Sequence, residues 1–295
     1  VCRTGSMLVR CARHVARNAG EPDIGLYGAA PEGEEYCITR LNLKANSLES
    51  DGISKGLEPV YPGQGLLVGG GRRPDLVLLD LVEGPLDARS RDRGFSRVEL
   101  KEYLPEGGFL ALLLPGKVLA GKDHMRFRER LVEQDALEAV IRLPNGLFPM
   151  VRVDVDLLLV RREKPAETKG RVLFADASAL PVDRVRRALA GGLAGKIVDL
   201  YSAFHREGEV AGPVGSGLHH RIVSAPEIEW VKSSSRDRDY NLDVSRYVVP
   251  EPEQVDLEEE FARLVGYERR REKLGREMEE QLGRVLARMR DRGGE

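Results

Sequence analysis

Two acidic side chains stand where an apolar segment of the sequence ends. The run from Leu76 to Leu79 is followed by Asp80, and Glu83 comes shortly after it. A carboxylate at the end of a strand can accept a hydrogen bond or a proton from a bound substrate. The simpler interpretation is that both side chains cap a strand end in a solvated loop, and it carries more weight on these residues alone.

The histidines and cysteines do not form a second candidate site. None of the histidines has a partner at metal-ligand spacing, so each is interpreted as structural or exposed; they are His14, His124, His205, His219 and His220. The cysteines show no zinc spacing and leave one odd thiol; they are Cys2, Cys11 and Cys37. We therefore expect no metal site, no disulfide framework and a reducing, cytoplasmic compartment.

Composition and charge limit the classes of function. With 41% hydrophobic and 32% charged residues, the chain is typical of a folded globular protein. Its longest apolar run, Phe109 to Leu114, is too short to cross a membrane. The net charge of -2 argues against coating nucleic acid by bulk electrostatics, so any DNA contact must use local patches. Three arginine clusters are candidates, although each alone is more often a solvated face: Arg89, Arg91, Arg93 and Arg97; Arg184, Arg186 and Arg187; Arg236 and Arg238.

The spacing of apolar residues predicts an α/β fold, because short β-rich runs alternate with amphipathic stretches. The first predicted helix begins at Ser6, which can cap it. The other predicted helices are Glu34–Ala45, Asp123–Glu133, Val182–Ala190 and Lys196–Phe204. The predicted strands are Asp23–Tyr27 closed by Gly28, Leu76–Leu81, Phe109–Leu114, Ala136–Leu143, Val153–Val160 and Val172–Phe174. Because most of them are apolar throughout, we expect a parallel sheet covered on both faces.

The chain is predicted to have a core, an extension and a C-terminal helix. Residues 1–165 form the core, 166–250 extend it and include a loop-rich stretch at 208–249, and 251–295 hold the helix. Apolar residues recur at three- and four-residue steps from Asp256 to Arg292, while three glycines weaken this helix. The pattern favours docking onto another subunit, with an intramolecular hairpin as the alternative. Because the sequence starts at Val1 without a methionine, we interpret its start as a fragment boundary.

Five ordered blocks of the sequence resemble the modification subunit of type I restriction-modification systems, a family of adenine-N6 DNA methyltransferases. The blocks are 107–119, 128–131, 139–148, 172–177 and a tyrosine-asparagine-leucine signature at 239–248. The resemblance implies a Rossmann-like, seven-stranded methyltransferase sheet. Such a sheet binds S-adenosylmethionine at its strand ends, and the target adenine is flipped out of the duplex. It also implies a specificity subunit docked on the C-terminal helix, with a restriction subunit as a further candidate partner.

The resemblance assigns cofactor binding to two places where the sequence departs from the family pattern. Cys2-Arg3-Thr4-Gly5-Ser6 stands at the glycine loop, and Arg3 and Ser6 replace glycines that let the backbone close around the cofactor. Tyr27-Gly28-Ala29-Ala30 ends the second strand, and Ala30 stands where the family has a glutamate that holds the ribose hydroxyls. A methyl group accepts no hydrogen bond, so we expect an affinity loss of about tenfold to a hundredfold. Glu32, close in sequence, is the alternative acceptor.

The family's asparagine-proline-proline-aromatic catalytic motif falls on Asp80, Leu81, Val82 and Glu83. Asp80 can still accept a hydrogen bond from an adenine amino group. Leu81 and Val82 remove the rigid double-proline turn. Glu83 removes the ring that would stack on the flipped base and adds an anion beside DNA.

These departures lead to three hypotheses. In the first, the chain is a catalytically impaired methyltransferase-fold subunit retained for assembly or DNA contact. In the alternative, it is an active enzyme in which Asp80 receives the amino group, while backbone contacts and a preceding segment hold the cofactor. A third, a domain that binds protein only, leaves the arginine clusters without a function.

Overall fold

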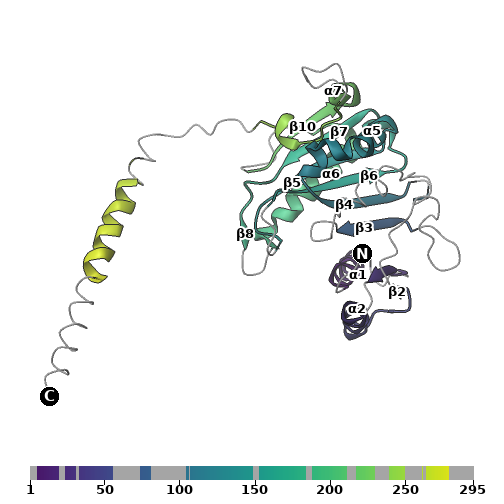
Figure 1. The fold of residues 1–295 in the computed structure, drawn as a ribbon, viewed down its shortest axis with the longest axis horizontal. Helices are drawn as coiled ribbons and strands as arrows, with labels where there is room; N and C mark the ends of the chain where they lie inside the picture. The colour runs from purple at the N-terminus through teal and green to yellow at the C-terminus, as the bar shows by residue number, and fades with distance from the viewer. Residues whose placement is uncertain are drawn as a thin grey trace. The chain divides into compact units, whose positions relative to one another are not determined.

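The computed structural model describes residues 5–19, 24–30, 33–55, 74–80, 104–105, 107–148, 153–183, 188–210, 217–229, 239–249, 261 and 264–278. The chain divides into two compact units, Val1–Val249 and Pro250–Glu295. The first unit is an α/β structure built on one large sheet (Figure 1). In the second, residues 264–278 are helical, as the sequence predicts. No described helix is both long and apolar enough to span a membrane.

Six strands form the large sheet, in the order β10-β7-β5-β6-β4-β3. They are β3 (Leu76–Asp80), β4 (Phe109–Pro115), β5 (Leu137–Leu143), β6 (Val155–Arg161), β7 (Arg171–Asp176) and β10 (His219–Ser224). Strand β3 pairs parallel with β4, and β5 pairs parallel with β7. Since β4 and β5 are both antiparallel to β6 between them, these four strands run in one direction and end at the same edge.

The expectation of an all-parallel sheet is wrong, because β6 and β10 run against the other strands. The connection from β5 to β6 is only eleven residues long, from 144 to 154, and its described residues are not helical. A connection this short favours an antiparallel return, because a parallel strand needs a crossover of a dozen or more residues. Both faces of β6 are covered, so its apolar run has the same composition as that of a parallel strand.

Two helices and two short strands make up residues 6–55. They are α1 (Ser6–Ala19), β1 (Gly28–Ala30), α2 (Glu34–Ala45) and β2 (Ile53–Lys55). Helices α1 and α2 lie where the sequence predicts them. The strand predicted at Asp23–Tyr27 is displaced: residues 24–27 are irregular, Asp23 lies outside the described residues, and β1 begins at Gly28. Pairing fixes this start, because β1 lies parallel to β2 and the Gly28 amide donates to the Gly52 carbonyl oxygen at 3.1 Å.

One prediction for the second half of the first unit is wrong. The helix predicted at Val182–Ala190 is instead β8 (Val182–Asp183) paired antiparallel with β9 (Ala188–Leu189). Val182 and Leu189 fit the spacing of a helix face, but they oppose each other across this hairpin. Helix α6 (Leu193–Glu207) follows and contains the predicted helix. The described part of the stretch 208–249, expected to be loop-rich, includes β10 and α7 (Ala225–Glu229), and β10 pairs with the distant strand β7.

Apolar side chains cover both faces of the sheet, with successive residues of each strand pointing to opposite faces. One face is covered by α4 (Lys117–Ala120), α5 (Met125–Glu133), α7 and the segment 239–248. The other is covered by α6, whose buried residues are Ile197, Leu200 and Phe204. The remaining short helices are η2 (Lys122–His124), η3 (Ala166–Thr168), η4 (Ala190–Gly192) and η5 (Val244–Arg246).

Candidate functional site

One predicted site residue, Asp80, lies at the shared edge at which β3, β4, β5 and β7 end. Asp80 ends β3 and is half-buried opposite Leu113 of β4, while β4 ends at Pro115. Ligands of open α/β sheets bind at such a carboxyl edge. The other three predicted motif residues, Leu81, Val82 and Glu83, lie outside the described part of the chain.

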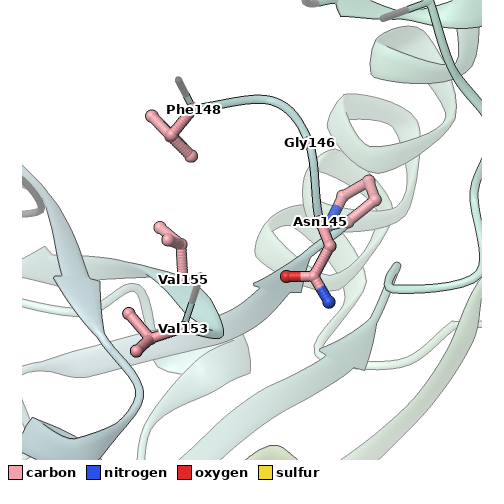
Figure 2. A pocket seen from close by; sticks show the side chains of 6 residues that line it. Asn145, Gly146, Phe148, Val153 and Val155 are labelled. Atoms are coloured by element: carbon pink, nitrogen blue, oxygen red, sulfur yellow. The ribbon is translucent and has the colours of Figure 1, made fainter. Parts of the chain in front are cut away.

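A shallow hollow lies at the same edge, between the end of β5 and the start of β6. Its lining residues are Pro144, Asn145, Gly146, Phe148, Val153 and Val155. Figure 2 shows Phe148 above the two valines, with Asn145 on the other side. Gly146 has a φ of 95°, a left-handed conformation that suits glycine and turns the chain back toward β6.

The lining of the hollow includes a half-buried aromatic ring and an exposed amide side chain. In the sequence analysis, Phe148 is only one residue of the block 139–148 that carries the family resemblance, and no site was predicted there. Its local signal is an aromatic residue after a proline-asparagine-glycine turn, which does not reveal that the ring faces the strand edge.

The residues predicted to hold the cofactor lie around α1 and β1. Gly5 precedes α1 with a φ of 69°, and a Cβ placed there would come within 3.2 Å of the Thr39 side chain of α2. Ser6 is the first helical residue of α1. Cys2, Arg3 and Thr4 lie outside the described residues.

Ala30 ends β1 and is fully buried. It packs in an apolar cluster with Val9 of α1, Leu43 of α2 and Ile53 of β2. An S-adenosylmethionine ribose needs a hydrogen-bond acceptor, and this methyl group within an apolar cluster does not supply one. At the position that the resemblance assigns to the ribose contact, Ala30 supplies no acceptor. Glu32, the alternative acceptor, lies outside the described residues.

A buried ion-pair network joins β5, β6 and the segment 239–248 at the carboxyl edge. The Arg142 guanidinium lies 3.2 Å from Asp156 Oδ1 and 2.9 Å from Asp243 Oδ1. Asp156 is fully buried, and burial raises the pKa of its carboxyl group to about 6 despite the arginine. Its Oδ2 has no hydrogen-bond partner among the described residues and lies 3.1 Å from where a Cβ on Gly116 would stand.

A second buried arginine fixes the backbone beside this edge. Arg128 of α5 donates to the carbonyl oxygens of Val118 at 2.9 Å, Gly121 at 2.7 Å and Tyr240 at 2.8 Å. It is 2% exposed, and burial lowers the pKa of its guanidinium to about 10. Arg128 therefore joins the connection between β4 and α5 to the tyrosine-asparagine-leucine signature.

At the opposite edge of the sheet, a fully buried carboxylate on β5 gathers polar groups from two other elements. Glu138 accepts from Arg161 Nε at 3.0 Å and from the Tyr201 hydroxyl of α6, and His205 Nδ1 lies 3.3 Å away. Burial, with Glu138, raises the pKa of Tyr201. The sequence signal for these networks is a charged residue within an apolar strand, because a buried charge needs partners.

The histidines, cysteines and arginine clusters singled out in the sequence form no site among the described residues. The described residues contain no group of histidine, cysteine, aspartate and glutamate side chains that could hold a metal ion. The first arginine cluster, the second at 184–187 and the third at 236–238 all lie outside the described residues. The structure therefore places Asp80 and the Phe148 hollow at one strand edge, and Gly5 with Ala30 around α1 and β1.

Sequence comparison identifies curated relatives with the same blocks. The chain is 27% identical over 292 residues to the type I restriction enzyme MjaVII methylase subunit of Methanocaldococcus jannaschii, covering 88% of this chain and 47% of that protein. It is 32% identical over 173 residues to the MjaVIII methylase subunit of the same organism, covering 57% and 27%. The chain thus spans about half the length of the first relative and about a quarter of the length of the second.

A solved structure confirms the fold class. The methyltransferase subunit of the type I restriction-modification system from Streptococcus thermophilus superimposes with a TM-score of 0.61 at 20% identity, over 84% of this chain and 53% of that one. A model of the N-6 DNA Methylase family matches residues 86–256, more than half of the chain. The matched range begins after Glu83, so it contains the scaffold blocks without the catalytic motif position. By this match the chain belongs to the N-6 DNA methylase family.

Proposed function

We propose that the chain acts as the modification subunit of a type I restriction-modification assembly, with adenine-N6 methylation impaired and the scaffold retained for assembly or DNA contact. Family membership and the methylase-subunit relatives support the first part. The observation that carries the impairment is Ala30, a fully buried methyl group at the position of the ribose-holding glutamate. In the cytoplasm the partners would be a specificity subunit, a restriction subunit and DNA.

Calorimetric titration with S-adenosylmethionine tests the impairment. Loss of a charge-assisted hydrogen bond costs about 1.5 to 3 kcal/mol, so the full chain should bind the cofactor about tenfold to a hundredfold more weakly than an intact site would. A dissociation constant in the low micromolar range would overturn the impairment.

The alternative, an active methyltransferase, has its own supporting observation. Asp80 offers a carboxylate at the carboxyl end of β3, so an acceptor remains for the amino group of an adenine. Transfer of labelled methyl groups to duplex DNA distinguishes the two functions. Transfer by the parent that disappears in Asp80→Ala, but persists in the exposed-edge control Asp154→Ala, would establish the active enzyme. Absence of transfer by the parent supports impairment.

A further inference from the structure

Helix α1 carries basic side chains on the side away from its buried residues. They follow one another at steps of three, one and three positions, which places them on one face of a helix: Arg10, Arg13, His14 and Arg17. All four are exposed, and α1 contains no aspartate or glutamate. Within the described part of the chain, neither Arg10 nor Arg17 has a hydrogen-bond or ion-pair partner, while Arg13 donates to the amide oxygen of Asn46. We call these four side chains the basic face.

Helix α2 exposes apolar side chains on the side away from its own buried residues. Ile38 is 46% exposed and Leu41 is 66% exposed. Cys37 and Ala45 are also exposed, and their spacing from Leu41 places them on the same face. Apolar side chains that gather on a surface mark interaction sites, whereas single ones do not. We call these four side chains the apolar face.

The basic face and the apolar face lie on the same side of the helix pair. Gly5, directly before α1, lies against Thr39 of α2, and Arg13 contacts Asn46 at the end of α2. The two helices therefore run side by side in the same direction (Figure 1). Both turn their buried residues into the apolar cluster that contains Ala30 of β1. Their exposed faces point away from this cluster together and form one surface.

The charge of the basic face is not neutralised by described carboxylates. The two acids of α2 are in its first turn, whereas Arg13, in the centre of the basic face, contacts Asn46 at the other end of that helix. Glu49 follows α2 and forms no ion pair with these arginines. The segment 20–23, which contains two acidic residues, lies outside the described residues. Three arginine charges therefore stand beside an exposed apolar surface.

We propose that the two faces together bind an amphipathic helix of a partner protein, one whose apolar stripe is flanked by aspartate or glutamate side chains. A helix that docks on another protein places apolar side chains at three- and four-residue steps on the binding surface, and Ile38 and Leu41 would cover them. The flanking carboxylates would pair with the guanidinium groups of the basic face, which can bind a carboxylate through two hydrogen bonds.

The composition of this surface favours such a partner over two other occupants. In a twofold contact between copies of this chain the surface would face itself, and neither face supplies a carboxylate for the arginines. The phosphate backbone of DNA would neutralise the basic face but would leave the apolar face in water. The proposal goes beyond the proposed function, because it requires neither the cofactor nor DNA.

Fluorescence anisotropy with a labelled synthetic peptide and the full chain tests this proposal. The probe is a helical peptide of about 18 residues with leucines at three- and four-residue steps and glutamates beside them. Replacement of Leu41 by Gln should weaken its binding by about tenfold, because an apolar contact is lost. The double variant Arg10→Gln, Arg17→Gln should weaken it by about threefold to tenfold, and less at high salt.

Matched control variants come from helix α6. Val198, which is 60% exposed, is the apolar control, and Val198→Gln should bind the peptide as the parent does. Lys196→Gln with Arg206→Gln removes the same charge from exposed positions and should also leave the affinity unchanged. The charge-reversed variant Arg10→Glu, Arg17→Glu should instead prefer a peptide in which lysines replace the glutamates.

The remaining outcomes overturn the proposal. They are absence of binding by the folded parent, equal affinity of the parent for the glutamate and lysine peptides, and equal losses in the α6 controls. If duplex DNA or anionic lipid vesicles bind the parent and not the double variant, while the peptide binds both equally, the basic face serves a nucleic acid or a membrane. Self-association that is lost in Leu41→Gln would assign the surface to a second copy. None of these results alters the proposed function, which the cofactor titration and the methyl-transfer assay test separately.

Discussion

At the scale of single residues, the unusual features of this chain are charges buried at the sheet edge. Asp156 is fully buried with one oxygen lacking a described partner, although Arg142 holds the other. A buried carboxylate is costly unless it is fully paired, so Asp156 is not there to maximise stability at neutral pH. Asp156 lies beneath Gly116, next to the candidate site. The free-energy cost of burying this carboxylate therefore falls at the edge where a ligand would bind.

Asp156 should make the stability of the protein depend on pH. Its pKa is about 6 in the folded protein against an ordinary value of 3.8, so the folded state holds the proton more tightly. The stabilisation is present below about pH 4 and is lost as the pH rises through 6, an effect on the order of 3 kcal/mol. Denaturant unfolding at several pH values should show this fall in the parent and not in Asp156→Asn. The Asp199→Asn variant, at an exposed position of α6, should behave like the parent, and parallel curves for parent and Asp156→Asn would refute the assignment.

At the scale of elements, the segment 239–248 holds its place through distant contacts rather than through its own secondary structure. Only η5 within it is regular. The Leu242 amide donates to the Leu119 oxygen at 3.0 Å, and the Tyr247 ring packs 4.2 Å from the Phe174 ring centre. Arg128 supplies the polar attachment, because it binds the Tyr240 and Asp239 carbonyl oxygens.

Replacing Arg128 should detach this segment before it unfolds the sheet. Arg128→Met leaves buried carbonyl oxygens without donors, at about 1 to 3 kcal/mol each, so a total loss of several kcal/mol is expected. Hydrogen exchange of the Leu242 amide should accelerate more than that of the β5 amides. Arg128→Lys, which keeps a donor, should recover part of the protection, while Arg126→Met on the exposed side of α5 should change neither. Equal acceleration at Leu242 and β5 would mean that the segment unfolds only together with the sheet.

At the scale of the whole molecule, the described helix of the second unit has an exposed apolar stripe. Leu264, Tyr267, Leu274 and Met278 are each about 60% exposed or more on the helix at 264–278. Exposed apolar stripes on helices mark sites of association with other proteins. This agrees with the proposed docking of the helix on a specificity subunit.

A substitution on this stripe should weaken subunit association without unfolding the first unit. Leu274→Gln should reduce the affinity for the specificity subunit by about tenfold or more, since burial of a leucine contributes about 1.5 to 3 kcal/mol. Arg276→Gln is the matched control, because Arg276 pairs with Glu272 at 3.5 Å on another face of the helix. Light scattering of mixtures of the two subunits measures the change, and equal affinities for both variants would exclude the stripe as the docking surface.

Local pattern was sufficient for several elements. Helix α2 spans the predicted residues 34–45, and β4 and β5 lie within one residue of their predicted ends. These segments carry a periodicity or an apolar run that local sequence displays. The direction of β6, the β8–β9 hairpin and strand β10 were not predictable in this way, because each is defined by a partner distant in the chain or by pairing across a turn.

The same distinction between local pattern and tertiary contacts holds for the candidate site. The sequence by itself determined the family resemblance and the expectation that Ala30 and Glu83 stand at motif positions of the family, since both depend only on which residue stands in each block. Only the tertiary structure decided that Ala30 is buried in an apolar cluster, that Phe148 lines a hollow at the strand edge, and that Arg128 joins α5 to the segment 239–248. The reason is that burial and facing depend on which strands pair and which segments cover them, and residues more than a hundred positions apart, such as Arg128 and Tyr240, meet only in the folded chain.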